Sequence, residues 1–203
     1  QIKLYNHGSF FDRGAIPPED FPALAQRVRA FDRVIVESHP ALIGERVLRF
    51  RDLLAGRLEV AMGLETAHPG VLARLNKRMT LDQFAGAARF LRSHGIDVRA
   101  FILVQPPFMA EAEAVEWAVQ SVQFAFGCGV SVAVVIPTRG GTAALDDLAV
   151  RGEFSPPRLA ALETAQEGGI RLRQGRVFAD TWDLERLASC RDCRSVRIRR
   201  IEE

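Results

Sequence analysis

The chain has 203 residues, 48% hydrophobic and 26% charged, and a chain of this length buries about 70% of the surface that its unfolded form exposes, which excludes a disordered protein. Its 27 basic and 25 acidic residues nearly balance, so charge gives no argument for nonspecific binding to long nucleic acid, and three cysteines are too few for a disulfide framework. No apolar run approaches the roughly 18 residues of a membrane span, and we therefore expect a cytoplasmic protein without a membrane partner.

Short β-rich segments alternate with segments of helical periodicity along the chain. The strands are predicted at 2–6, 33–37, 58–63, 97–104, 131–136 and 170–179, and the helices after Pro17, after Thr80, from Ala110 to Phe126 and after Ser155. This alternation is typical of successive βα units and predicts an α/β protein with a parallel sheet. No G-x-G-x-x-G follows the first strand, which argues against a dinucleotide-binding sheet.

Polar side chains follow the strands where each one ends, which favours a partial (β/α) TIM-like barrel over an open doubly wound sheet. The series is His7-Gly8-Ser9, Glu37-Ser38-His39, Glu65-Thr66, Gln105 and Thr138-Arg139. Glu37 and Glu65 come directly after apolar strands, and carboxylates in such places normally have partners. Glu65 could pair with an arginine on a neighbouring loop, and His7 and His39 could be ordinary polar loop residues.

Several segments resemble one enzyme family in order along the chain. They are IKLYNHGSFFD at 2–12, VESHP at 36–40, VAMGLET at 60–66, LNKRMT at 75–80, PPF at 106–108 and DTWDL at 180–184. Together they resemble the radical S-adenosylmethionine (radical SAM) enzymes, and within them the branch of the archaeosine-synthesis radical protein and, more distantly, the elongator catalytic subunit. The resemblance implies a radical SAM-type partial barrel with S-adenosylmethionine and a 4Fe-4S cluster as cofactors.

One defining motif of that family does not occur in this chain. The family holds its cluster with a C-x-x-x-C-x-x-C loop after the first strand, whereas the cysteines here are Cys128, Cys190 and Cys193. Because Gln1 begins directly in a predicted strand, we expect the first barrel strand and the cluster loop to lie upstream. The expected domains are a partial barrel over 1–179 and a C-terminal extension over 180–203.

The resemblance also implies roles for individual residues in holding S-adenosylmethionine. Gly8 and Ser9 would help to bind its amino group, and Glu65, with Thr66 beside it and Glu37 nearby, would accept hydrogen bonds from the ribose hydroxyls or the amino group. Lys77 or Arg78, in the helix after the strand at 58–63, would meet the cofactor carboxylate. Gln105 would lie beside the adenine. Lys77 stands out because Lys3 is the only other lysine, but Lys77 and Arg78 could also form a solvated helix end.

The C-terminal extension contains a separate motif, Cys190-Arg191-Asp192-Cys193. Two soft ligands at this spacing suit zinc or iron–sulfur sites, so Cys190 and Cys193 are candidates for an auxiliary metal site with further ligands from outside the chain. The segment 196–201 alternates apolar and basic residues and predicts an edge strand with an arginine face. That face could contact RNA phosphate or simply protect a sheet edge.

The function implied by the resemblance is part of a radical SAM enzyme that generates a 5'-deoxyadenosyl radical. By analogy with the nearest branch, the substrate is tRNA or another RNA, and this chain alone would be inactive because it lacks the cluster ligands. Two alternatives stay open: a cluster-free βα-barrel lyase or hydrolase using Glu37 and Glu65 as an acid–base pair, and a noncatalytic module that binds a small ligand. The residues do not indicate the atom attacked or the oligomeric state.

Overall fold

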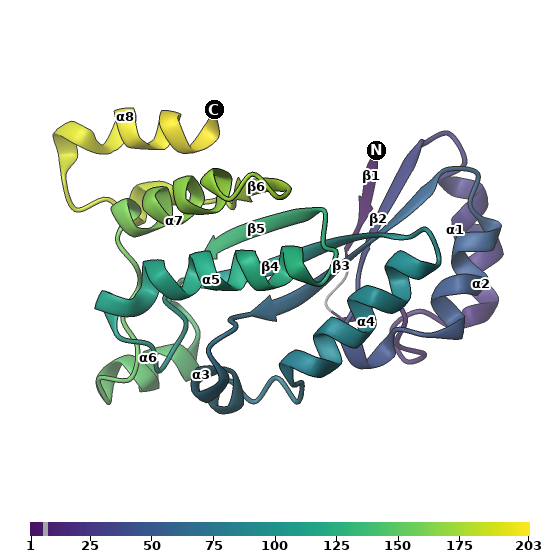
Figure 1. Ribbon diagram of the computed structural model, residues 1–203, viewed down its shortest axis with the longest axis horizontal. Helices are drawn as coiled ribbons and strands as arrows, with labels where there is room; N and C mark the ends of the chain where they lie inside the picture. The colour runs from purple at the N-terminus through teal and green to yellow at the C-terminus, as the bar shows by residue number, and fades with distance from the viewer. Residues whose placement is uncertain (6–7) are drawn as a thin grey trace.

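The computed structural model describes residues 1–5 and 8–203, and one six-stranded parallel sheet organises them (Figure 1). The strands pair in chain order, each with the next. They are β1 Ile2–Leu4, β2 Arg33–Glu37, β3 Arg57–Glu65, β4 Asp97–Val104, β5 Val132–Pro137 and β6 Arg176–Ala179. The sheet curls into a half-barrel, so the predicted partial barrel with parallel strands is confirmed.

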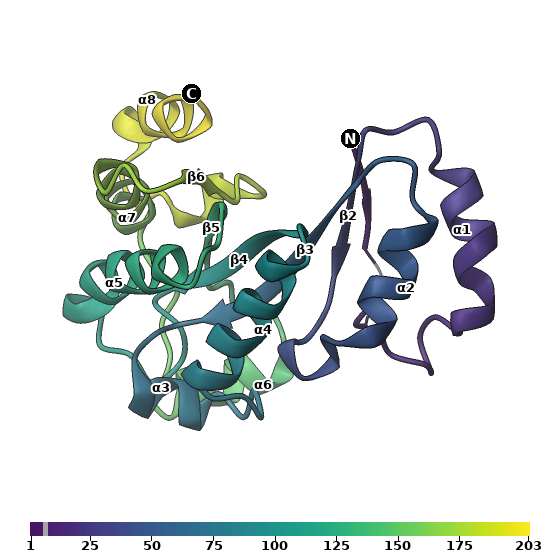
Figure 2. The same cartoon turned by 45° about the vertical axis from the view of Figure 1, so that its right-hand side comes forward.

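The helices are α1 Phe21–Arg27, α2 Glu45–Leu53, α3 Pro69–Arg74, α4 Leu81–Ser93, α5 Ala114–Gly127, α6 Ala143–Val150, α7 Leu159–Arg171 and α8 Arg191–Glu202, with single 3-10 turns η1 Pro18–Asp20, η2 Pro40–Leu42, η3 Glu111–Glu113 and η4 Leu184–Leu187. Of these, α1, α2, α4, α5 and α7 cover one face of the sheet, as right-handed crossovers in constant direction require, and α8 packs on α7 (Figure 2). In the described residues no helix is long and apolar enough to cross a membrane.

Alternation along the strands separates an apolar face from a polar one. Val34, Val60, Val98 and Ala133 belong to the core shared with the helices. The intervening side chains point to the concave face of the half-barrel, where charged residues such as Glu59 lie. The concave face is therefore the part of the sheet that can meet polar molecules.

Local capping explains why α4 begins and ends where the sequence predicts. The Thr80 side chain accepts the backbone N–H of Gln83, and the Gln83 side chain accepts the backbone N–H of Thr80. The helix buries Phe84, Ala88 and Leu91 on one face, and Gly95 with φ of 71° follows its last turn. The connection that leads into this helix contains Lys77, so the start of α4 fixes one end of the Lys77 loop.

The C-terminal part of the fold corrects two sequence-based predictions. The segment 196–201, predicted as an edge strand, lies in α8, and the predicted strand 170–179 begins only at Arg176 because α7 continues to Arg171. Ile198 and Ile201 lie three residues apart and pack on the core from one helical face. The apolar and basic residues of 196–201 fit a strand or a helix. The Cys190 side chain caps the first turn of α8, which contains this segment, and stabilises the helix.

Candidate functional site

The carboxyl ends of β2 and β3 bring three of the predicted residues together. Lys77 Nζ lies 2.5 Å from Glu65 Oε1, and both side chains are half-buried. Burial raises the pKa of Glu37, while the charge of Lys77 opposes this rise and that of Glu65 adds to it. The carboxylates and the ammonium group thus share one electrostatic environment at the edge where barrel enzymes place their chemistry.

An irregularity in β3 makes room for the ion pair. The register between β3 and β4 shifts between Gly63 and Glu65, and Glu65 adopts a left-handed φ of 64°. A Cβ atom on Gly63 would lie 2.3 Å from Glu65 Oε1 and 2.7 Å from Lys77 Nζ. A side chain at this position would displace the ends of Glu65 and Lys77, so the bulge and Gly63 together leave the space that the ion pair occupies.

A chain of hydrogen bonds positions the backbone of Lys77. The Ser9 hydroxyl oxygen accepts the backbone N–H of His39 at 2.9 Å. His39 Nδ1 accepts the backbone N–H of Ala41 at 3.1 Å, so its Nε2 carries the proton and donates to the Lys77 carbonyl at 2.9 Å. Ser9 and His39 therefore hold the loop between α3 and α4 against the ends of β1 and β2.

Gln105, directly after β4, has a buried side chain that is only partly hydrogen-bonded. Its side chain is 1% exposed, and its Nε2 donates to the Ser155 carbonyl at 2.9 Å and to the Ser155 hydroxyl at 2.7 Å. Its Oε1 is buried without a hydrogen-bond partner. Because an unpaired buried acceptor is costly, this atom is suited to receive a donor from a bound molecule.

Other predicted residues take different places. Thr66 is buried, and its hydroxyl accepts the backbone N–H of His68 at 3.1 Å, which supports the turn into α3. Gly8 is exposed, and His7 lies outside the described residues. Lys77 and Arg78 lie in the connection between α3 and α4 and not in a helix, as the resemblance had implied, and Arg78 is exposed there. Lys77 is therefore the cation at the site.

The three cysteines do not fit an iron–sulfur cluster. Cys128 is buried at the carboxyl end of α5, while Cys190 and Cys193 are exposed at the start of α8, the outermost helix on α7 (Figure 1). In the described part of the chain no group of three His, Cys, Asp or Glu side chains could hold a metal ion. Metal binding by Cys190 and Cys193 stays a sequence-based prediction that needs ligands from elsewhere.

The amino-terminal end of the concave face carries an ion network that sequence reasoning missed. Glu59 is fully buried and binds Arg33 at 2.7 Å and Arg99 at 2.6 Å. Asp97 binds Arg33 and Arg92, each at 2.8 Å. The available signal was the charged residue at the start of each neighbouring strand. Because Glu59 has two arginine partners and Asp97 has three, counting Arg57 at 3.3 Å, the network is a support and not an open site.

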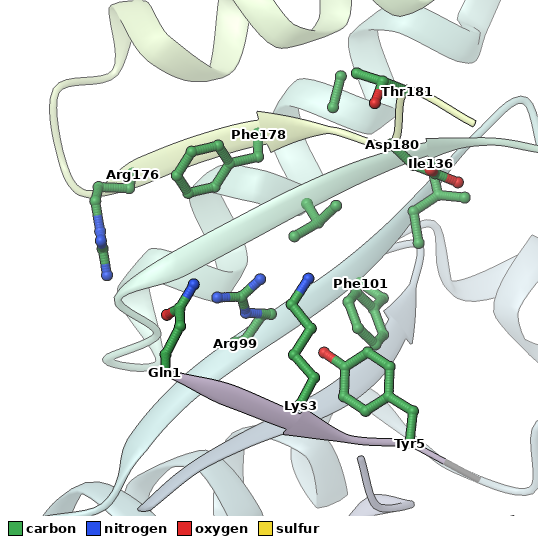
Figure 3. A pocket seen from close by; sticks show the side chains of 12 residues that line it. Gln1, Lys3, Tyr5, Arg99, Phe101, Ile136, Arg176, Phe178, Asp180 and Thr181 are labelled. Atoms are coloured by element: carbon green, nitrogen blue, oxygen red, sulfur yellow. The ribbon is translucent and has the colours of Figure 1, made fainter. Parts of the chain in front are cut away.

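Between the strands the concave face holds a cavity of about 540 Å³ (Figure 3). Lys3 reaches it from β1 and Tyr5 from the residue after β1, Arg99 and Phe101 from β4, and Phe178 from β6. Burial raises the pKa of Tyr5, whose ring meets Phe101 edge to face at 6.4 Å. Aromatic and cationic side chains suit a planar or anionic molecule in this space.

Comparisons with known proteins agree with this architecture. Two proteins named archaeosine synthase subunit beta are similar in sequence: one from Thermococcus kodakarensis, 31% identical over 60% of this chain and 39% of its own length, and one from Methanosarcina acetivorans, 26% identical over 78% and 47%. The chain thus spans less than half the length of these curated relatives. No protein-family model matches it.

Solved structures share the fold at low sequence identity. The archaeal Elp3 of Methanocaldococcus infernus, with residues 1–46 deleted, aligns over 99% of this chain and 54% of its own with a TM-score of 0.73 and 14% identity. Streptococcus suis SuiB bound to S-adenosylmethionine aligns over 90% and 51% with a TM-score of 0.55 and 14% identity. The predicted resemblance to radical SAM proteins and the partial-barrel fold are confirmed.

Proposed function

We propose that this chain is the S-adenosylmethionine-binding part of a radical SAM enzyme that modifies RNA. The observation that carries the proposal is the ion pair of Glu65 and Lys77 at the carboxyl end of β3, and the unpaired buried acceptor of Gln105, directly after the neighbouring strand β4, supports it. The fold shared with radical SAM proteins supports the same assignment. Glu37 lies close enough to contribute, since its pKa responds to both charged neighbours.

The residues present fit the groups of S-adenosylmethionine. Lys77 donates one of its three ammonium hydrogens to Glu65 and has two left for the cofactor carboxylate. Glu65 and Glu37 accept from the ribose hydroxyls or the amino group, and Gln105 Oε1 accepts from the adenine amino group. Gly8, Thr66 and Arg78 stay sequence-based candidates for holding the same cofactor, with Gly8, next to Ser9, assigned to its amino group. Each group holds or orients the cofactor without itself reacting.

S-adenosylmethionine supplies radical chemistry in enzymes of this kind, and the protein supplies binding and orientation. The C-x-x-x-C-x-x-C motif that holds the iron–sulfur cluster in that family does not occur in this sequence. We therefore assign no reaction step to the chain alone and expect it to be inactive without the cluster-bearing segment.

The RNA part of the proposal rests on the names of the relatives. Archaeosine is the product named in both matched proteins, and the word subunit in their names implies a second polypeptide for them. For this chain we propose a tRNA substrate and a protein partner. Nucleoside mass spectrometry of tRNA from cells with and without the gene tests this: a modified base should disappear with the gene, and identical nucleosides would contradict the RNA substrate while leaving the cofactor proposal intact.

Equilibrium dialysis with radiolabelled S-adenosylmethionine tests the cofactor site. The chain should bind it, and Glu65→Gln should weaken binding about tenfold or more, since a hydrogen bond to a charged group contributes about 1.5–3 kcal/mol. Glu167→Gln, an exposed change on α7, is the control. No binding by the wild-type chain, or equal binding by both variants, would overturn the proposal. Iron-independent turnover of a substrate that needs Glu37 would instead favour an acid–base lyase or hydrolase.

A further inference from the structure

A pair of thiols outside the proposed cofactor site forms a second chemically distinct centre. Cys190 caps the first turn of α8, where its sulfur accepts the backbone N–H of Cys193 at 3.4 Å. The two sulfur atoms lie 3.1 Å apart, within S–H···S hydrogen-bonding distance, and both side chains are exposed. We propose that Cys190 and Cys193 form a redox-active dithiol that undergoes thiol–disulfide exchange, with Cys190 as the attacking thiol and Cys193 as the resolving thiol.

The surroundings favour this division of roles. Cys190 Sγ accepts the backbone N–H of Cys193 at the N-terminus of α8, where the helix dipole favours negative charge, and Arg197 lines the hollow beside it. The Cys193 sulfur lies 3.1 Å from that of Cys190 and is the thiol within reach to close an internal disulfide. A thiol with more thiolate character reacts first, and the second thiol stays in reserve beside it.

The charged groups around the pair are mostly basic. A hollow of about 160 Å³ next to the sulfurs is lined by Arg158, Arg194 and Arg197, with Leu159 and Ala188 as apolar walls. The nearby carboxylates are engaged elsewhere or exposed.

Those carboxylates are Asp192 in the same turn, Glu185, which lies 3.9 Å from Arg194, Glu163, which binds Arg197, and Glu111, which lies 3.0 Å from Arg158. An anionic disulfide compound therefore finds cations close to the attacking sulfur.

The exchange balances without another cofactor. The Cys190 thiolate attacks one sulfur of an external disulfide R–S–S–R, which breaks that bond, forms a mixed disulfide on Cys190 and releases R–S⁻. The Cys193 thiolate then attacks the Cys190 sulfur and releases the second R–S⁻. The protein dithiol loses two electrons and two protons, and the external disulfide gains them as two thiols.

Mass spectrometry after treatment with oxidised glutathione tests the inference. The wild-type chain should lose the mass of two hydrogen atoms and keep no glutathione, whereas Cys193→Ser should keep one glutathione on Cys190. Cys190 should also react with iodoacetamide about threefold or more faster than Cys193 near pH 7. Cys128→Ser, which removes only the buried thiol, is the matched control and should behave as wild type.

Three results would overturn the dithiol assignment. These are a stable glutathione adduct on the wild type without an internal disulfide, equal alkylation rates for the two cysteines, and stoichiometric zinc that protects both thiols from alkylation. Cys190→Ser should leave S-adenosylmethionine binding unchanged, so failure of this inference is separate from failure of the proposed function.

Discussion

Replacing Gly63 by alanine should disturb the proposed cofactor site more than the fold. The added Cβ would lie 2.3 Å from Glu65 Oε1, and ordinary contact begins at 3.4 Å, so the carboxylate must retreat by about 1 Å. Lys77 Nζ, 2.7 Å from the same Cβ, must move with it. Because both charged groups leave the positions in which they would meet the cofactor, we expect the loss of one hydrogen bond to a charged group, about 1.5–3 kcal/mol or about 10- to 100-fold in affinity.

Isothermal titration calorimetry with S-adenosylmethionine measures this loss, and thermal unfolding measures the fold. The free energy of unfolding should change little, because alanine in a strand recovers about 0.5–1 kcal/mol of the entropy that glycine costs. The matched control is Gly86→Ala on α4, where a Cβ meets nothing within 4 Å and should stabilise the chain. Wild-type affinity in Gly63→Ala would refute the reasoning.

Three further changes test other parts of the site and its support. Gln105→Met should weaken S-adenosylmethionine binding and lower the free energy of unfolding by about 1 kcal/mol, measured by calorimetry and urea denaturation; unchanged binding would show that Oε1 has no ligand. Glu59→Gln should cost about 3 kcal/mol in urea denaturation without changing cofactor affinity, because two arginines lose their buried partner; a cost below that of the exposed change Glu167→Gln would contradict a supporting network. The raised pKa of Glu37 favours the protonated folded state, so stability present below the ordinary value of 4.5 is lost as pH rises through the folded pKa. Glu37→Gln should remove that loss, and parallel thermal-unfolding curves for the two proteins from about pH 4 to pH 7 would show that burial has no such effect.

The sheet was largely predictable because its strands combine β-branched residues with regular spacing. The strands at 33–37 and 97–104 have the predicted bounds. The C-terminal elements were not predictable in this way, because the order of apolar and basic residues in 196–201 fits both a strand and a helix. There the decision depends on tertiary packing of Ile201 against α7 and on the cap at Cys190, which a local pattern does not contain.

In the candidate site, the residues at strand ends were predictable from the sequence, and the loop residues that contact them were not. Glu37, Glu65 and Gln105 were predictable because parallel strands bring their carboxyl ends to one edge. Ser155, which orients Gln105 from 50 residues away, and His39, which holds the Lys77 loop from 38 residues away, were not. Their roles depend on how loops cross in space, and a polar residue in a loop carries no signal of that crossing.

The two ends of the concave face separate support from function by how completely their polar groups are paired. At the amino-terminal end, Glu59 has two arginine partners and no exposed surface, so a ligand would have to break existing bonds to enter. At the carboxyl end, Lys77 has one carboxylate partner and Gln105 Oε1 has none. An unpaired buried acceptor destabilises the free protein, and a hydrogen bond from a bound molecule would remove that cost. The paired end makes the sheet rigid, and that rigidity holds the unpaired groups at the opposite end in the geometry that binding requires.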